Sequence, residues 1–263
     1  MRTVARPYTI AVPSSNRATT FRDKTLAVLI AGGVDPARVT VWVPDHDQAE
    51  HYDKVLGGTV HIRAGHGRGV RQARNAIATG YPTGTDLVCL DDDIAGFYQC
   101  IDREQPIVPM TDLHGFITRA IDTADGHLWC VYPVANAYFM HPTRVRRGGL
   151  WYAEGAVMGW RVTRDYDREL VTLDDKEDFE RSCRFYLTDG EVVRFDSITF
   201  KSRFYKEPGG MQDYRTAESV KVGALRLAAM YPDLATAYRA RSGWWEVRLR
   251  DRRRTRRPAR ATT

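Results

Sequence analysis

The feature of this sequence that most constrains its fold is an apolar run that ends in three acidic residues. Residues 86–90 read Asp-Leu-Val-Cys-Leu, and Asp91, Asp92 and Asp93 follow directly. A continuous apolar run of this length is typical of a central strand in a parallel sheet, because such a strand is buried on both faces. The run therefore predicts an α/β protein with helices on both sides of the sheet.

Short strands and helices alternate along the sequence before this run. Strands are predicted at residues 8–12, 39–43 and 59–62, and helices at residues 21–31 and 70–79. The alternation predicts a three-layer α/β sandwich around a mostly parallel central sheet. Ligands of such sheets bind beyond the carboxyl ends of the strands, and polar clusters follow several of the predicted strands.

The second half of the sequence is less regular. It contains strand-like segments at residues 128–134, 156–162 and 191–200, and helical segments at residues 175–185 and 217–229. The sequence shows no internal repeat and no linker that would divide it. We therefore expect one domain over residues 1–245.

The net charge of +6 is concentrated in residues 246–263. This segment holds eight arginines against Glu246 and Asp251, so the rest of the chain is neutral. Such a segment predicts a disordered basic arm that suits a polyanion through counterion release, and the alternative is a solubilising tail. The ordinary apolar fraction of 43% excludes wholesale disorder, collagen and disulfide-scaffold classes.

Cysteine spacing and hydropathy indicate the compartment. The four cysteines form no CxxC pair and no metal-ligand spacing with the histidines, which predicts reduced, buried thiols. The longest apolar run, residues 26–31, is far too short to cross a bilayer, and no segment of signal-peptide kind is found near the start. We expect a cytoplasmic protein that does not associate with membranes.

The acidic triplet is a candidate metal site. In an extended chain the side chains at positions i and i+2 point the same way, so Asp91 and Asp93 can share one face. Two carboxylates there suit Mg²⁺ or Mn²⁺, which can clamp a diphosphate and neutralise its charge as it leaves. The alternative is a helix cap or a solvated turn. Haloacid-dehalogenase-like phosphatases also place Asp-x-Asp after a strand, but they need Thr or Val where this chain has Ala95.

Five motifs together resemble those of a known enzyme family. The stretch Arg-Gln-Ala-Arg-Asn-Ala-Ile, followed by the apolar strand and the acidic triplet, resembles the signature of family 2 nucleotide-sugar glycosyltransferases of the GT-A fold. The five motifs lie at residues 10–17, 71–77, 85–93, 176–181 and 207–212. In this order they look most like the TET-associated glycosyltransferases of phages, proposed to put sugars on hydroxymethylated DNA bases. The resemblance spans residues 8–215.

The resemblance implies a site for a nucleotide-sugar donor, with UDP as the expected nucleotide. The residues that it assigns to this donor site, apart from the acidic triplet, are Pro13, Ser15, Asn16, Arg17, Asp45, Arg71, Arg74, Asn75, Gly209 and Gly210. Within the triplet, Asp92 would meet the ribose or the sugar, and Asp91 and Asp93 would hold the metal.

Several of these assignments have structural alternatives. Asn16 and Arg17 can instead cap the first helix. The arginines at positions 71 and 74 share a helix face with Asn75, and such a face is often solvent-exposed and salt-bridged. The glycines at positions 209 and 210 can form a lid over the diphosphate or a simple turn. No histidine follows His141, so a third metal ligand is not evident.

The resemblance also implies a general base. Transfer with inversion needs a carboxylate that takes the proton of the acceptor hydroxyl, and the ED pair of the resembling families supplies it. Asp178 is therefore the expected base, with Glu177 as the alternate. A helix N-terminus also favours carboxylates regardless of function, and a retaining enzyme would not use this base.

The acceptor side is predicted from aromatic and basic residues. Trp151 and Tyr152 resemble the acceptor-side segment of GT-A enzymes, where an aromatic ring can stack on a sugar or a flipped base. Aromatic residues at such positions are equally often part of the core. Arg146 and Arg147 form a basic cluster nearby that could hold DNA phosphates.

These observations predict a metal-dependent glycosyltransferase that acts on 5-hydroxymethylpyrimidine in DNA. Two alternatives stay open. One is a glycosyltransferase whose acceptor is a glycan, a protein or a small molecule. The other is a nucleic-acid-binding module that has kept the fold without catalysis.

Overall fold

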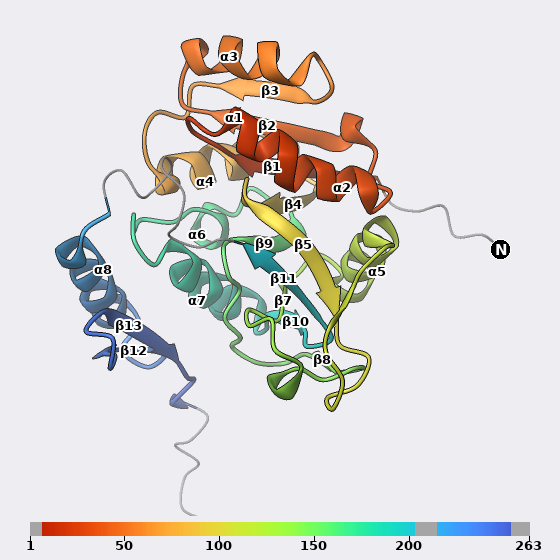
Figure 1. The fold of residues 1–263 in the computed structure, drawn as a ribbon. Helices are drawn as coiled ribbons and strands as arrows, with labels where there is room; N and C mark the ends of the chain where they lie inside the picture. The colour runs from red at the N-terminus through yellow and green to blue at the C-terminus, as the bar shows by residue number, and fades with distance from the viewer. Residues whose placement is uncertain (1–6, 203–214, 254–263) are drawn as a thin grey trace, which may run out of the picture.

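An eight-stranded sheet organises the chain (Figure 1). The computed structural model describes residues 7–202 and 215–253. The strands, in spatial order, are β3 (His61–Ala64), β2 (Val39–Val43), β1 (Tyr8–Pro13), β4 (Asp86–Leu90), β9 (Val157–Arg161), β7 (Trp129–Val131), β10 (Val193–Phe195) and β8 (Val145–Arg146). Strands β3, β2, β1 and β4 run parallel, β9 is antiparallel to both of its neighbours, and β8 is antiparallel to β10.

Strand β4 is central, as its apolar run predicts. Val88 and Leu90 belong to one core cluster, whereas Leu87 and Cys89 belong to a second cluster on the opposite face. Period-2 alternation thus sends successive side chains of one strand into two separate cores. The predicted mixed α/β class with a mostly parallel central sheet is confirmed.

Helices cover both faces of the sheet. The first core cluster contains residues of α1 (Ala18–Phe21), the π-helical turn η1 (Arg22–Leu26), α2 (Ala27–Ala31), α3 (His46–Leu56) and α5 (Leu113–Ala124). The second contains residues of α4 (Val70–Thr79) and α7 (Glu177–Asp189), next to the short helix α6 (Tyr166–Glu169). Two 3-10 turns, η2 (Pro36–Arg38) and η3 (Ala137–Phe139), lie in connections.

A second sheet continues from the acidic triplet. Strand β5 (Ile94–Gln99) begins directly after it and pairs antiparallel with β6 (Val108–Pro109) and β11 (Ile198–Ser202). The triplet therefore joins a strand of the large sheet to a strand of the small one. This position brings the end of β11 close to Asp93.

The C-terminal part of the described chain is a helix and a hairpin. Helix α8 (Ala217–Met230) packs against β12 (Ala235–Arg239) and β13 (Trp245–Leu249) through a third core cluster. The predicted disordered arm of residues 246–263 is therefore wrong for residues 246–249, which lie within β13. Residues 254–263 lie outside the described residues.

Residues 246–249 form a strand because apolar residues alternate with the charged ones in this segment. In β13 the residues Trp245, Val247 and Leu249 alternate with charged ones and face the third core cluster.

Among the described residues, no helix has both the length and the apolar character needed to cross a membrane.

Candidate active site

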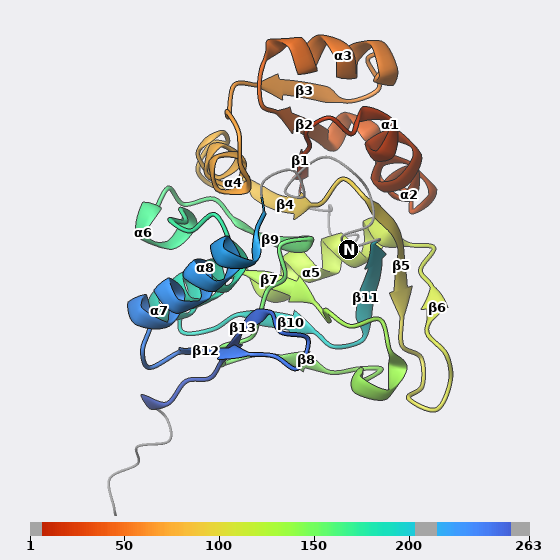
Figure 2. The same ribbon diagram turned by 60° about the vertical axis from the view of Figure 1, so that its left-hand side comes forward.

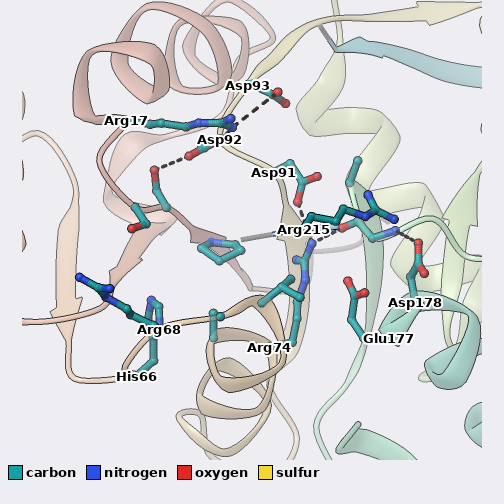
Figure 3. A pocket seen from close by; sticks show the side chains of 18 of the residues that line it. Arg17, His66, Arg68, Arg74, Asp91, Asp92, Asp93, Glu177, Asp178 and Arg215 are labelled. Atoms are coloured by element: carbon teal, nitrogen blue, oxygen red, sulfur yellow. Dashed lines mark hydrogen bonds and ion pairs between the residues drawn. The ribbon is translucent and has the colours of Figure 1, made fainter. Parts of the chain in front are cut away.

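A cavity of about 700 Å³ lies where the parallel strands end. The carboxyl end of β1, the loop after β2 and the triplet after β4 form one wall, with part of α4 (Figure 3). The segment before β9 and the start of α7 form the opposite wall. Of the residues expected to act, the cavity is lined by Pro13, Ser15, Asn16, Arg17, Asp45, Arg74, Asp91, Asp92, Asp93, Tyr152, Glu177 and Asp178.

Asp92 is the buried anchor of the first wall. The Ser14 hydroxyl donates a hydrogen bond to its Oδ2 at 2.5 Å, and the Arg17 guanidinium donates to its Oδ1 at 3.2 Å. Burial raises the pKa of Asp92 to about 6, against the opposing effects of Ser14 and Arg17. Neither contact belongs to a helix cap: Arg17 occupies the N-cap position of α1 without a side-chain cap bond. Asn16 adopts a positive φ of 58° and turns the loop toward the cavity.

Asp91 has a side-chain partner on one carboxylate oxygen, and Asp93 has a partner on each. Arg74, buried in α4, donates to Asp91 Oδ1 at 2.7 Å and to the Gly155 carbonyl at 2.8 Å. The Ser202 hydroxyl of β11 donates to Asp93 Oδ1 at 2.5 Å, and Asp93 Oδ2 lies 3.9 Å from Arg17. The side chains of the triplet are therefore held by three segments: the loop between β1 and α1, helix α4 and strand β11.

The donor set of Asp91 and Asp93 fits a divalent cation. The described residues contain no group of three or more side chains that could hold a metal by themselves. Magnesium is usually bound by one or two carboxylates, with waters and substrate phosphates completing the shell, and manganese accepts the same oxygen ligands. Asp91 and Asp93 both line a cavity large enough for a diphosphate, which matches that mode.

The second wall carries three carboxyl groups. Asp178 Oδ2 accepts a hydrogen bond from the Tyr152 hydroxyl at 2.5 Å, and its Oδ1 accepts from the Phe179 backbone at 2.9 Å. Glu177 beside it is 8% exposed, and burial together with Asp178 raises its pKa to about 8, although Arg74 opposes this shift. Tyr152 stays a donor because burial and Asp178 raise its pKa well above its ordinary value.

Glu154 is the third of these carboxyl groups, and the sequence interpretation did not assign it a role. Burial, followed by the charges of Asp178 and Asp91, raises the pKa of Glu154 to about 8. Its Oε2 atom is buried and has no hydrogen-bond partner among the described residues. Glu154 follows Tyr152 by two residues in an irregular segment, so no sequence pattern marked it.

The loop between β3 and α4 was also missed. It reads Gly-His-Gly-Arg-Gly over residues 65–69 and brings His66, Arg68 and Gly69 to the cavity. All three glycines have positive φ values of 107°, 72° and 107°, a conformation that favours glycine. Burial lowers the pKa of His66, so a neutral ring is favoured there. Alternating glycines directly before a helix were the available signal, because such loops bring backbone N–H groups to anions.

Two positively charged residues complete the cavity. Lys176 precedes α7 in a left-handed conformation with φ 69°, and its ammonium lies 3.0 Å from Glu246 of β13. Arg215 lies 2.9 Å from Asp175. The C-terminal hairpin thereby contributes directly to the cavity through Glu246.

Two predicted donor-site residues of α4 do not reach the cavity. Arg71 pairs with Asp174 at 3.0 Å on the surface, and Asn75 exchanges hydrogen bonds with the backbone of Val171. Only Arg74 of the predicted face is turned inward, together with Ala73 and Val70. The predicted role of Arg71 and Asn75 in lining the cavity is therefore wrong: one is salt-bridged on the surface, and the other fastens a loop.

Asp45 has a structural role besides its place in the cavity wall. It is the N-cap of α3, and its Oδ1 accepts a hydrogen bond from the Gln48 backbone at 2.9 Å. The predicted lid residues Gly209 and Gly210 lie outside the described residues.

Only one of the four predicted acceptor residues lines the cavity. Tyr152 lines the cavity, but Trp151, Arg146 and Arg147 do not. The Trp151 ring lies between the guanidinium groups of Arg146 and Arg194, 4.4 and 4.8 Å from its centre, and packs against the second core cluster. Trp151 and Tyr152 are adjacent in an irregular segment, and of the two only Tyr152 lines the cavity.

The two predicted acceptor arginines are bound to carboxylates instead. Arg146 donates to Asp196 at 2.7 Å, and Arg147 donates to Glu191 at 2.7 Å. Asp196 is fully buried and also accepts from Arg144 and Arg194. These acids neutralise much of the basic cluster that the sequence predicted.

Comparison with known proteins gives similarities of structure only. No protein-family model matches the sequence, and no curated protein matches it. One similar solved structure is a candidate nucleotide-diphospho-sugar transferase from Desulfovibrio desulfuricans G20, with 12% identity, a TM-score of 0.44, and coverage of 72% of this chain and 79% of that one. Another is glucosyl-3-phosphoglycerate synthase from Mycobacterium tuberculosis in complex with Mn²⁺, UDP and glucosyl-3-phosphoglycerate, with 11% identity, a TM-score of 0.47, and coverage of 95% and 92%.

Proposed function

We propose that this protein is a glycosyltransferase that moves a sugar from a nucleotide-diphosphate sugar to a hydroxyl acceptor. One observation carries the proposal: a single cavity has a metal-type aspartate triplet on one wall and a base-type carboxylate, Asp178, on the other. Glycosyl transfer needs both, because charge develops on the leaving diphosphate while the acceptor hydroxyl loses a proton.

The first wall suits the donor. Asp91 and Asp93 would hold a divalent cation, Mn²⁺ or Mg²⁺, which when bound supplies positive charge to the leaving diphosphate. Arg68 and the N-terminus of α4 at Gly69 add positive potential on the same side. Asp92, fixed by Ser14, offers a buried acceptor for a hydroxyl of the ribose or the sugar.

The second wall suits proton transfer. Tyr152 fixes the orientation of the Asp178 carboxylate through a short hydrogen bond. Burial and the neighbouring Asp178 raise the pKa of Glu177, which favours its protonated form and makes it the poorer base. These two facts favour Asp178 over Glu177 as the group that accepts the proton of the acceptor hydroxyl.

We further propose that the acceptor is 5-hydroxymethylpyrimidine in DNA and that the donor is UDP-linked. The support is the order of the sequence motifs, which resembles that of the DNA-modifying enzymes of phages, and the basic character of the C-terminal residues. The cluster around Arg146 and Arg147 adds little, because carboxylates bind both side chains.

The test is a transfer reaction followed by mass spectrometry. The protein is incubated with a panel of UDP-sugars, Mn²⁺, and DNA with or without hydroxymethylcytosine, and the digested nucleosides are weighed. We expect a mass gain of one sugar on the modified base only. Asp178→Asn and Asp93→Ala should abolish it, whereas Asp174→Asn, a surface aspartate outside the cavity, should not.

Other outcomes test the DNA acceptor separately from the glycosyltransferase activity. Release of UDP without any gain on DNA would refute the DNA acceptor and keep the donor assignment. Absence of UDP release from every donor, with the variants folded, would refute the glycosyltransferase and favour a binding protein.

A further inference from the structure

The β12–β13 hairpin concentrates arginines that no carboxylate of the described residues neutralises. Arg239, Arg241, Arg248 and Arg250 are all exposed, and within residues 7–202 and 215–253 none of them forms an ion pair. The two acids of the hairpin segment are engaged elsewhere, since Glu246 binds Lys176 and Asp251 binds Arg253. The hairpin therefore carries about four uncompensated positive charges, and all but that of Arg239, which lies opposite Trp245, are outside its core-facing side.

This pattern differs from that of the other basic cluster of the molecule. Arg144, Arg146 and Arg194 all donate to the buried Asp196, and Arg147 binds Glu191. Those guanidinium groups are fixed by internal acids. Within the described ranges the hairpin arginines have no acid partner: Arg239 donates to the Gly243 carbonyl and Arg248 lies against the Tyr238 ring, so their charges stay uncompensated.

Two aromatic rings lie exposed among these arginines. Trp244 is 48% exposed at the turn and Tyr238 is 39% exposed on β12. The Arg248 guanidinium lies 5.3 Å from the centre of the Tyr238 ring. Flat rings beside unpaired guanidinium groups are the chemistry that binds nucleic-acid strands, in which bases stack on the rings and phosphates meet the cations.

The register of the hairpin joins this surface to the cavity. Tyr238 lies opposite Glu246, and Thr236 lies opposite Arg248, so these four side chains share one face of the hairpin. Glu246 lines the cavity and binds Lys176 next to α7. The opposite face, with Val247 and Leu249, packs on α8, which Figure 2 shows beside α7.

We infer that the exposed face of the β12–β13 hairpin is a docking surface for the acceptor DNA strand, an inference that rests on the proposed DNA acceptor. Arg248 and Arg250, with Arg241 of the turn, would contact phosphates, and Trp244 and Tyr238 would stack on bases. This face also carries Glu246, which lines the cavity. A DNA strand bound on the face would therefore extend to the cavity wall on which Asp178 lies.

Fluorescence anisotropy with labelled DNA oligonucleotides, single-stranded and duplex, tests the inference at 50 and 200 mM salt. The full-length protein is compared with Arg248→Gln/Arg250→Gln and with Trp244→Ala. The matched control is Arg22→Gln/Arg119→Gln, which removes the same charge from two exposed arginines that pair with local acids. Thermal melting establishes that each variant is folded.

We expect the double hairpin variant to bind DNA about tenfold more weakly at 200 mM salt, with the logarithmic salt slope reduced by about 1.5. Trp244→Ala should weaken binding about tenfold, with little change in that slope. Equal weakening in the control variant would show an effect of net charge alone and overturn the inference. Unchanged binding in both hairpin variants would overturn it as well.

Donor turnover separates this inference from the proposed function. UDP release from a UDP-sugar in the absence of DNA should be the same in the wild type and the hairpin variants. If DNA binding depends on the hairpin but no sugar reaches DNA, the docking surface stands and the acceptor proposal fails. If sugar reaches DNA equally in all variants, the acceptor proposal stands and the docking surface fails.

Discussion

The buried carboxyl group of Glu154 should make the stability of this protein fall as pH rises. Burial and the charges of Asp178 and Asp91 raise the pKa of Glu154 to about 8, whereas an unfolded glutamate titrates near about 4.3. Between these two values the native state holds a proton that the unfolded state has lost. The free energy of unfolding therefore decreases with pH across this window, and the decrease ends above about pH 8.

The variant Glu154→Gln isolates this effect, because glutamine has the shape of the protonated carboxyl group and does not titrate. One proton difference corresponds to about 1.4 kcal/mol per pH unit. Relative to the wild type, the variant should therefore be about 2 kcal/mol more stable at pH 7.5 than it is at pH 6.0. Comparing two pH values removes any constant effect of the substitution on packing.

Urea unfolding followed by tryptophan fluorescence measures this change, in buffers without divalent cations. Other groups also titrate in or near this range, since burial raises the pKa of Asp92 to about 6 and raises that of Glu177 as well. They are present in both proteins, so their contributions cancel in the difference between the variant and the wild type. The exposed Glu50 of α3 provides the control variant Glu50→Gln, whose difference from the wild type should not change with pH. A constant difference for Glu154→Gln as well would refute the reasoning, because it would mean that Glu154 is ionised in the folded protein at pH 6.

Three further predictions follow from single contacts. Tyr152→Phe removes the hydrogen bond to Asp178 and should lower kcat about tenfold with little change in KM for the donor, measured by UDP release. Asp196→Asn leaves three guanidinium groups around an uncharged group and should lower the free energy of unfolding by about 3–5 kcal/mol, measured by urea unfolding. Gly159→Ala places a Cβ 2.6 Å from the Trp129 ring and should cost about 1–3 kcal/mol of stability, measured in the same way.

Each of these predictions has its own contradicting result. A Tyr152→Phe variant whose KM rises while kcat is unchanged would indicate a role in donor binding instead. An Asp196→Asn variant as stable as the wild type would mean that solvent screens the three arginines. A Gly159→Ala variant with wild-type stability and fluorescence would show that the Trp129 ring moves aside at little cost.

The sequence predicted the first half of the fold well, because its patterns there are local. The run of residues 86–90 is β4 with the same bounds, and the predicted helix at residues 70–79 is α4. Strand β2 also matches residues 39–43. In these segments hydrophobic periodicity and the flanking polar or glycine residues agree, so tertiary contacts did not need to override them.

Besides the short helix α6, two longer helices were missed, for opposite reasons. Helix α3 is polar along most of its length and buries only Tyr52 and Leu56, so its apolar stripe is too thin to mark it. Helix α5 has a clear apolar face but lies between segments without regular pattern, and no prediction was made there. In both cases packing of the helix against the sheet stabilises it more than its local sequence does.

The sequence predicted only part of the site, because it shows which element a side chain belongs to better than the direction in which that side chain points. The triplet and the ED pair reached the cavity because strand ends and helix starts point there by topology. On α4, spacing placed Arg71, Arg74 and Asn75 on one face, but a face spans a wide angle, and only Arg74 lies at its inner edge. Glu154 and the loop of residues 65–69 reach the cavity through tertiary contacts that no local pattern expresses.

The bond between Lys176 and Glu246 ties the start of α7 to a strand 70 positions later in the chain. A ribosome makes the chain from its N-terminus, so the sheet around β4 can form well before β13 exists. Until β13 emerges, the buried ammonium of Lys176 lacks its counter-ion, and the wall that carries Asp178 is incomplete. We therefore expect a nascent chain to collapse early and to complete this cavity only after β13 has been made.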